Sequence, residues 1–301
     1  MSEAKPGILS ARSAASLERE PLVLTARAVA KSMHQGTHRA SGTGGSTEFY
    51  DYKQYAEGDS VRHIDWKALG RSDRLYLRRY EQETRMTVGI ALDTSASMRY
   101  AGEKSEHPSK LHRACEIAAS LAYLACTQGD RVVLSTRGGA PGAPAAGWPA
   151  FALAIQTLRA CLEDDGASRS DASFAGMIAK HPIECDVLAL ITDGIEDPTE
   201  LARSMRSAAG TRGRDLVFIQ LLTRDELDLP DAGLAHFRDP ETGERTVTDT
   251  AQVAELYREK ISAHIREIER AVRSVRGLYH LAVTGDEPIE SVRAVVRRAA
   301  R

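Results

Sequence analysis

The chain has 301 residues, of which 42% are hydrophobic and 27% are charged, proportions that are typical of a globular protein. Forty basic and 42 acidic side chains leave a formal net charge of −2. This balance argues against a protein that coats nucleic acid through bulk positive charge. Residues 138–158 form the longest uncharged stretch, and its prolines and glycines are not typical of a membrane span.

The cysteines and the first residues of the chain both bear on its compartment. None of the cysteines belongs to a Cys-x-x-Cys pair, and their neighbours are apolar. We therefore interpret Cys115, Cys126, Cys161 and Cys185 as small buried side chains in a reducing compartment. The first twenty residues carry acids and lack the basic-then-apolar pattern of a leader. We expect a cytoplasmic protein without a membrane span.

The first 85 residues contain one helix candidate and a stretch rich in aromatic and arginine residues. Apolar positions at helical spacing predict a helix over Pro21–Ser32, and the Gly-, Ser- and Thr-rich residues 34–47 predict a loop. Residues 75–79 alternate in strand fashion. We take residues 1–85 as an N-terminal region that contains β-strands.

Arginines and aromatic side chains are mixed between Arg62 and Arg85, a composition that can stack bases and hold phosphates. Acidic residues interleave with these arginines, so the local excess of positive charge is small. They are Asp65, Asp73, Glu81 and Glu83. We therefore favour a folded region with internal ion pairs over a nucleic-acid site.

From residue 86 onward, predicted strands alternate with predicted helices, which is typical of a parallel sheet with helices on both faces. Strands are expected at 86–93, Arg131–Thr136, Asp186–Thr192, Asp215–Leu222 and Leu278–Val283. Helices are expected at Lys110–Thr127, Ala150–Leu162, Phe174–Ala179, Pro198–Ala208, Ala251–Val275 and from Glu287 onward, with Asp286 as the last N-cap. Turn residues predict a hairpin over 234–249. The sequence thus predicts an α/β domain over 86–301 with a mostly parallel, doubly wound sheet.

Polar side chains follow two of these strands. Asp93, Ser95 and Ser97 come after the first strand, at the end where open parallel sheets bind their ligands. Asp193, followed by Gly194, comes after the strand that ends at Thr192 and supplies a second acid. Carboxylate and hydroxyl oxygens are ligands for a hard divalent cation such as Mg²⁺ or Mn²⁺. The sequence therefore predicts a cation site at the strand ends.

Three interpretations of these strand ends stay open. In the first, they form a non-enzymatic docking surface, which we favour because the sequence lacks a P-loop, a GxGxxG, a GxSxG and an HExxH motif. In the second, Asp93 is the nucleophile of a Mg²⁺-dependent phosphoryl-transfer hydrolase, although Ser95 stands where a haloacid dehalogenase-type phosphatase carries its acid. In the third, the domain is purely structural, and the polar residues cap the next helix without an ion.

The same residues carry a resemblance to known families. The strings DTSAS, from Asp93 to Ser97, and ITDG, from Ile191 to Gly194, resemble the metal-ion-dependent adhesion site of von Willebrand factor A-type domains. A GD-R-IDW signature upstream resembles that of the bacterial domain of unknown function 58 family. Its residues here are Gly58, Asp59, Arg62, Ile64, Asp65 and Trp66.

This resemblance covers most of residues 20–300 and implies a von Willebrand factor A-like fold. It also implies a metal site at Asp93, Ser95, Ser97 and Asp193. The family resemblance further implies a non-enzymatic partner of a MoxR-type AAA+ ATPase, acting on an unknown client protein in chaperone-like maturation or assembly.

In one respect the sequence departs from the A-type pattern. Those domains add a threonine ligand at the start of a helix, and the corresponding segment here has no such threonine. Matching the threonine–aspartate pair of the family selects Ser170 and Asp171, whereas matching the apolar spacing of Phe174 and Ile178 selects Ala172. Ser170 is therefore the candidate for the remaining hydroxyl ligand.

Overall fold

A computed structural model of the chain describes residues 20–37, 51–54, 76–79, 85–102, 107–137, 140–164, 173–210, 214–230, 233–240 and 243–300. The chain forms two compact units, one of Met1–His34 with Met86–Arg301 and one of Gln35–Arg85. In the smaller unit, β1 (Asp51–Gln54) pairs antiparallel with β2 (Tyr76–Arg79), which confirms that the N-terminal region contains β-structure. The signature that ends at Trp66 lies outside the described residues.

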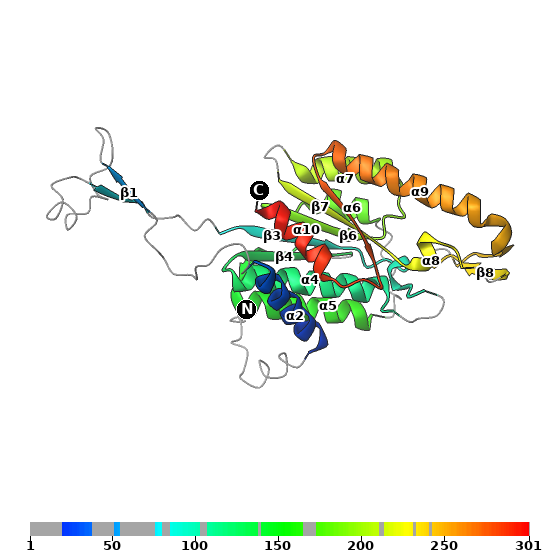
Figure 1. The fold of residues 1–301 in the computed structure, drawn as a ribbon, viewed down its shortest axis with the longest axis horizontal. Helices are drawn as coiled ribbons and strands as arrows, with labels where there is room; N and C mark the ends of the chain where they lie inside the picture. Colours follow the sequence, from blue (N-terminus) through cyan, green and yellow to red (C-terminus); the bar gives the residue numbers. More distant parts are fainter. Residues whose placement is uncertain are drawn as a thin grey trace, which may run out of the picture. The chain divides into compact units, whose positions relative to one another are not determined.

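The larger unit is built on a six-stranded sheet with the order β10-β7-β6-β3-β4-β5 (Figure 1). Its strands are β3 (Thr87–Leu92), β4 (Arg131–Thr136), β5 (Ala145–Ala146), β6 (Val187–Thr192), β7 (Asp215–Leu222) and β10 (Leu278–Val283). Neighbouring strands are parallel except β5, which is antiparallel to β4. The expected mostly parallel, doubly wound α/β fold is confirmed.

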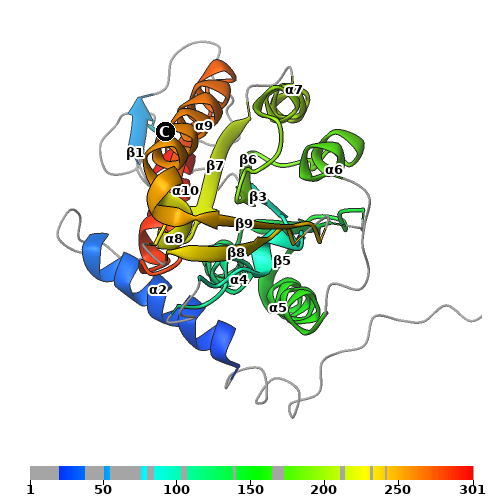
Figure 2. The ribbon, with the colours of Figure 1, turned by 90° about the vertical axis from the view of Figure 1, so that its right-hand side faces the viewer.

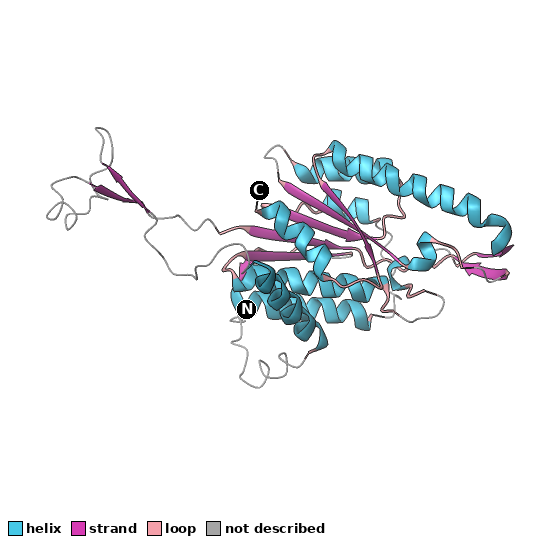
Figure 3. Ribbon diagram, viewed as in Figure 1, coloured by secondary structure: helices cyan, strands magenta, loops and turns pink. Residues whose placement is uncertain are grey.

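Helices cover both faces of this sheet (Figure 3). One layer consists of α2 (Pro21–Thr37), α4 (Lys110–Thr127), α5 (Gly147–Glu163) and α10 (Ile289–Ala299). The other consists of α6 (Phe174–Lys180), α7 (Pro198–Ala209) and α9 (Thr250–Ser274). Each layer encloses its own apolar core, because the central strands are buried on both faces.

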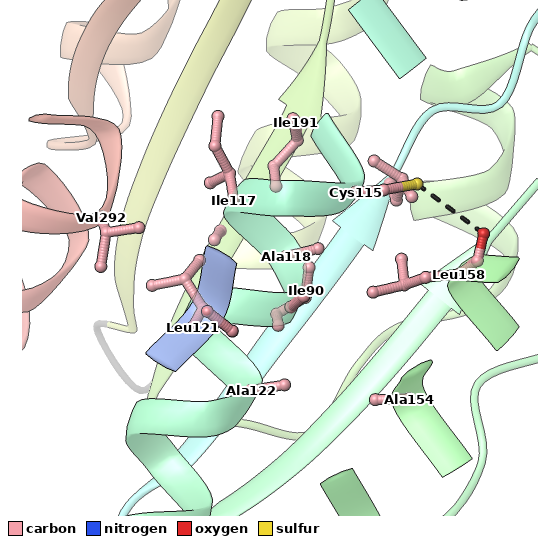
Figure 4. Close-up of a cluster of buried hydrophobic side chains, with 14 of the residues drawn as sticks. Ile90, Cys115, Ile117, Ala118, Leu121, Ala122, Ala154, Leu158, Ile191 and Val292 are labelled. Carbon is pink, nitrogen blue, oxygen red and sulfur yellow. Dashed lines mark hydrogen bonds between the residues drawn. The ribbon is translucent and has the colours of Figure 1, made fainter. Parts of the chain in front are cut away.

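The core beneath α4 is formed by aliphatic side chains of the sheet and of two helices. Figure 4 shows Ile90 of β3 and Ile191 of β6 beside Ile117 and Leu121 of α4. All four side chains are buried. The helical spacing of the two α4 residues places them on one face, which is the face that packs on the sheet.

The middle of the sheet is a topological switch point. β3 and β6 are neighbours, yet the chain leaves β3 for α4 in one helical layer and leaves β6 for α7 in the other. Ligands of open parallel sheets bind outside the carboxyl ends of strands at such a point. Asp93 and Asp193 follow these two strands, so the topology brings the two acids to one edge.

Three further elements lie after the strand ends. They are η2 (Ser97–Arg99), α8 (Arg224–Leu227) and the antiparallel ribbon of β8 (Leu234–Arg238) and β9 (Arg245–Asp249). The ribbon confirms the expected hairpin. Figure 2, which faces the carboxyl ends of the strands, shows β8 and β9 lying across that end of the sheet.

Several helix boundaries differ from the prediction. α2 continues to Thr37, beyond the expected end at Ser32, and Met33 packs against the core there. The expected N-cap Asp286 is wrong, since Pro288 occupies that position before α10, and the fixed φ of proline suits a helix start. Neither α8 nor β5 was predicted, because four and two residues are too few for a periodic pattern.

The position of α2 changes the expected division at residue 86. From the sequence we expect this helix to belong to residues 1–85, whereas the structure groups it with the α/β unit. Val23 and Ala26 are fully buried in the core cluster that also contains α4 and α5 residues. The guanidinium of Arg27 lies 5.9 Å from the centre of the Trp148 ring of α5. Burial of its apolar face therefore attaches α2 to the α/β core.

The cysteines agree with the prediction only in part. All four are free thiols, and Cys115 is buried, but Cys126, Cys161 and Cys185 are partly exposed. Apolar neighbours in sequence do not guarantee burial: Cys126 and Cys161 lie near the ends of α4 and α5, and Cys185 lies in the loop before β6. Among the described helices, none combines the length and apolar character that crossing a membrane requires.

Two adjacent residues of α2 test its packing. Val23 is fully buried, whereas Leu24 is 53% exposed. We expect Val23→Ala to lower the free energy of unfolding by about 1–2 kcal/mol, because it removes buried methyl groups. Leu24→Ala should change it by less than about 0.5 kcal/mol. Urea unfolding measures both values, and equal effects would contradict the packing of α2 on the core.

Candidate functional site

Asp93 is fixed between the ends of β3 and β6. Its backbone N–H donates to the carbonyl oxygen of Ile191 at 2.9 Å, which continues the parallel ladder beyond β3. The carboxylate is buried; Oδ1 accepts a hydrogen bond from the N–H of Ser95 at 2.9 Å, and Oδ2 accepts one from the hydroxyl of Thr192 at 2.7 Å. Both strand ends therefore hold this carboxylate in place.

The two serine hydroxyls of the motif meet in the turn after Asp93. Ser95 Oγ and Ser97 Oγ lie 3.0 Å apart, and both residues are buried. The N–H of Met98 donates to the carbonyl oxygen of Ser95 at 3.2 Å, which closes the turn into η2. The alternate positions of the two serines thus bring their hydroxyls together, as the sequence predicts.

Asp193 occupies the equivalent place after β6. Its Oδ1 accepts from the N–H of Ile195 at 3.3 Å, and Gln220 Nε2 donates to its backbone carbonyl at 2.9 Å. Gly194 has φ +70°, and a Cβ there would lie 2.8 Å from Ile268 Cδ1. Glycine is required at this position, because a side chain would be strained and would clash with α9.

A buried lysine, Lys110, lies next to Asp193. Its ammonium donates to Asp193 Oδ2 at 2.9 Å and also pairs with Glu226 Oε1. Burial by itself lowers the pKa of Lys110, but the charges and hydrogen bonds of Asp193 and Glu226 outweigh it and raise the pKa. The lysine therefore carries its charge inside the protein. We define this trio as the Lys110 cluster.

Glu226 connects this cluster to two further elements. Its Oε2 accepts from the N–H and the hydroxyl of Thr223, at 2.8 and 3.1 Å, in a capping box at the start of α8. The hydroxyl of Tyr257, on α9, donates to the carbonyl oxygen of Glu226 at 2.9 Å. The cluster thereby links the connections after β3, β6 and β7 to the helix that follows the ribbon.

A cavity of about 1180 Å³ lies at the strand ends. Its lining includes Asp93, Ser95, Ser97 and Asp193, together with part of the β8–β9 ribbon. It contains six carboxylates and three guanidiniums: Asp93, Asp193, Glu196, Asp225, Glu226 and Asp239, with Arg99, Arg137 and Arg238. The ammonium of Lys110 is the adjacent buried cation. These charged groups sum to −2, which matches the charge of one divalent cation.

The electrostatics of Asp93 also fit a cation. Burial and the nearby charge of Asp193 raise the pKa of Asp93 to about 6, against the lowering effect of its hydrogen bonds. A positive ion beside it would relieve this cost. Within the described ranges, no three His, Cys, Asp or Glu side chains gather as metal ligands. An ion here would therefore depend on Ser95 and Ser97 as well as on the acids.

The structure brings four of the five predicted site residues together, namely Asp93, Ser95, Ser97 and Asp193. Ser170 and the alternative Ala172 lie outside the described residues. That these residues bind an ion stays a prediction.

Three residues of the site were not predicted from the sequence: Lys110, Glu226 and Glu196. The carboxylate of Glu196 accepts from the N–H groups of Phe174 and Ala175 and so caps α6 from the loop after β6. The only sequence signal for Lys110 is a cation in the first turn of an otherwise apolar helix, where the helix dipole disfavours positive charge.

Comparison with known proteins adds the following similarities. The sequence profile of the family described as "Protein of unknown function DUF58" matches residues 51–271. Uncharacterized proteins of Mycobacterium bovis and Mycobacterium tuberculosis are 23% identical over 256 residues, which cover 84% of this chain and 79% of theirs.

Two solved structures from Bacteroides are also similar. One is an aerotolerance-related membrane protein from Bacteroides fragilis, with 18% identity, a TM-score of 0.44, and coverage of 71% of this chain and 98% of that chain. The other is the conserved hypothetical protein BatB from Bacteroides thetaiotaomicron, with 17% identity, a TM-score of 0.45, and coverage of 72% and 100%.

The buried charge of Asp93 makes stability depend on pH. Its pKa is about 6 in the fold, against an ordinary value of 3.8, so the folded protein holds an extra proton between these pH values and loses stability as the pH rises through them. In buffer with EDTA, the wild type should lose on the order of 2–3 kcal/mol relative to Asp93→Asn between pH 4 and pH 7. Urea unfolding at both pH values measures this, and an unchanged difference would contradict it.

Removing the ammonium of the Lys110 cluster should destabilise the fold. Lys110→Met leaves the buried Asp193 and the partly buried Glu226 without their cation, so we expect a loss of about 3–5 kcal/mol in the free energy of unfolding at pH 7. The matched control is Lys180→Met, at an exposed position of α6, with an expected change below about 0.5 kcal/mol. Similar values for both variants would show that the ion pairs contribute nothing.

Proposed function

The chain belongs to the DUF58 family, and we propose that it is a non-enzymatic docking protein whose strand-end cavity binds a divalent cation and, through it, a partner protein. One observation carries this proposal. Asp93 and Asp193, which follow two neighbouring strands, meet two serine hydroxyls at one cavity, and the charged groups of this cavity together with the adjacent Lys110 sum to −2. Mg²⁺ or Mn²⁺ matches this charge and these oxygen ligands.

The residues of the site have two roles: some would bind the ion, and Lys110 neutralises part of the charge of the acidic side chains. Asp93, Ser95 and Ser97 would hold the ion, with Asp193 beside them and Ser170 as the further candidate. Lys110 neutralises part of the acid charge, so a divalent ion balances the remaining charge of −2 and no excess negative charge is left to repel a carboxylate. When bound, the ion supplies a position for a carboxylate of the partner, because Mg²⁺ in proteins keeps waters that a ligand can replace.

The hydrogen bonds of Asp93 support a ligand more than a nucleophile. Both of its carboxylate oxygens accept hydrogen bonds, from Ser95 and from Thr192, so neither oxygen is left without a partner and the carboxylate is held in one orientation. Ser95 stands where a phosphatase of the haloacid dehalogenase type carries an acid. These two points favour docking over the alternative of phosphoryl transfer.

The partner that we propose is a MoxR-type AAA+ ATPase, which the family resemblance implies. The ATPase would dock at the cavity in the cytoplasm, and the pair would act on a client protein in chaperone-like maturation or assembly. Cation-dependent docking gives a direct test, because removal of the ion should release the ATPase without unfolding the chain.

The test begins with the ion. Isothermal titration of the purified full chain with Mg²⁺ and with Mn²⁺ should show binding, and the double variant Ser95→Ala, Ser97→Ala should abolish it while the circular dichroism spectrum stays unchanged. Ser207→Ala, at an exposed position near the end of α7, is the control and should bind as the wild type does. Equal affinity in the double variant would refute the ligand assignment.

The same variants then test the partner. The immobilised chain should retain the purified MoxR-type ATPase encoded nearest to it in Mg²⁺, and should release it in EDTA or with Asp93→Ala. Retention that is indifferent to both changes would overturn cation-dependent docking. Hydrolysis of generic phosphate esters in Mg²⁺ that disappears with Asp93→Asn would favour the phosphoryl-transfer alternative.

A further inference from the structure

The β8 strand forms one wall of the cation cavity. Every residue from Leu234 to Pro240 lines the cavity, whereas β9 contributes no lining residue among those that the structure describes. Figure 2 shows the ribbon across the carboxyl ends of the central strands. Since neighbouring residues of a strand point to opposite faces, lining by all of them indicates that the edge of β8 borders the cavity.

The hydrogen-bond pattern identifies which backbone groups lie on that edge. Thr250 donates to the carbonyl oxygen of Gly233 at 2.8 Å, and Asp239 donates to that of Glu244 at 2.9 Å. Hydrogen-bonded and non-hydrogen-bonded pairs alternate along an antiparallel ribbon. Ala235 and Phe237 therefore bond to β9, opposite Thr248 and Thr246. The N–H and C=O groups of Leu234, His236 and Arg238 point away from β9.

The described strands give β8 no other neighbour, because β8 and β9 form a two-stranded sheet. A strand edge with unpaired backbone groups is a template for another extended chain. Exposed apolar side chains lie along the same cavity: Leu234 (75%), Phe237 (38%), Ile195 (59%) and Tyr100 (39%). Such a group of exposed apolar residues marks a surface that a protein partner covers.

We infer that an extended acidic segment of the partner adds to the edge of β8 as a third strand and places one Asp or Glu side chain over the strand-end cation. The backbone bonds at Leu234, His236 and Arg238 supply affinity, and the apolar lining selects apolar neighbours of the acid. The inference rests on the proposed cation site, because the ion cancels the charge of −2 that would otherwise repel a carboxylate.

His236 offers a matched pair of variants. His236→Pro removes an N–H from the free edge without removing a bond to β9, and proline is tolerated on edge strands. His236→Ala removes the imidazole but keeps the N–H. Binding of an added strand should therefore weaken about fivefold to tenfold in the proline variant and stay within about twofold in the alanine variant.

The probe is a random peptide library displayed on phage and selected on the full chain in Mg²⁺. We expect selected peptides to carry one Asp or Glu between apolar, β-branched residues, and we expect a synthetic copy to bind the wild type and His236→Ala. Binding should weaken in His236→Pro, in Asp93→Asn and in EDTA. Amide exchange measured by NMR should slow at His236 and Arg238 when the peptide binds the wild type, which tests the edge even if the proline variant loses its ribbon.

Several results would overturn the inference. They are the absence of any enriched peptide, unchanged exchange at His236 and Arg238 in the complex, and a dimer of the chain that His236→Pro dissociates, which would assign the edge to a second copy. If Asp93→Asn and EDTA weaken peptide binding but His236→Pro does not, the peptide does not pair with the edge of β8. The inference then fails, and the proposed function stands. If only His236→Pro weakens binding, the cation part fails, and the proposed function fails with it.

Discussion

The strand-end face depends on one buried ion-pair cluster. Lys110 begins the helix after β3, and its ammonium joins Asp193 after β6 to Glu226 after β7. A buried charge that loses its partner costs several kcal/mol. The three connections must therefore keep their relative positions, and Asp93 and the serines of the motif are held in the same arrangement. The cluster thereby stabilises the strand-end site, and Asp193 and Glu226 also line the cavity, together with β8 of the ribbon.

Lys110 neutralises only part of the negative charge of the acidic side chains at the strand ends, which leaves Asp93 with a perturbed pKa. Asp93 accepts two hydrogen bonds, yet burial and the charge of Asp193 still raise its pKa. Perturbed carboxyl groups in a cavity are typical of functional sites, because a fold selected only for stability would avoid the cost. In this molecule the carboxylate that carries this free-energy cost, Asp93, lies at a topological switch point. Open α/β sheets bind their ligands at such points.

Local pattern was sufficient to predict much of this arrangement. The apolar run before Asp93 and the helical spacing of Ile117 and Leu121 indicate a strand and a helix, because each element has its own period. The alternate serines and Asp193 are visible as strand-end oxygens for the same reason. Two short elements were not predicted, because β5 and α8 each span only about one period and a pattern needs repeats. The end of α2 was placed too early, and Met33 beyond it packs against the core.

By itself, the sequence determined the α/β class, the hairpin and the four strand-end oxygen residues, because periodicity and turn residues are local properties. Only the tertiary structure decided that Lys110 meets Asp193 and Glu226, which are 83 and 116 positions away in the chain. It also decided that α2 packs on the α/β core and that the edge of β8 borders the cavity. Such contacts depend on the spatial order of the strands in the sheet and on how the helices pack against it. A pattern of neighbouring residues in the sequence does not encode that arrangement.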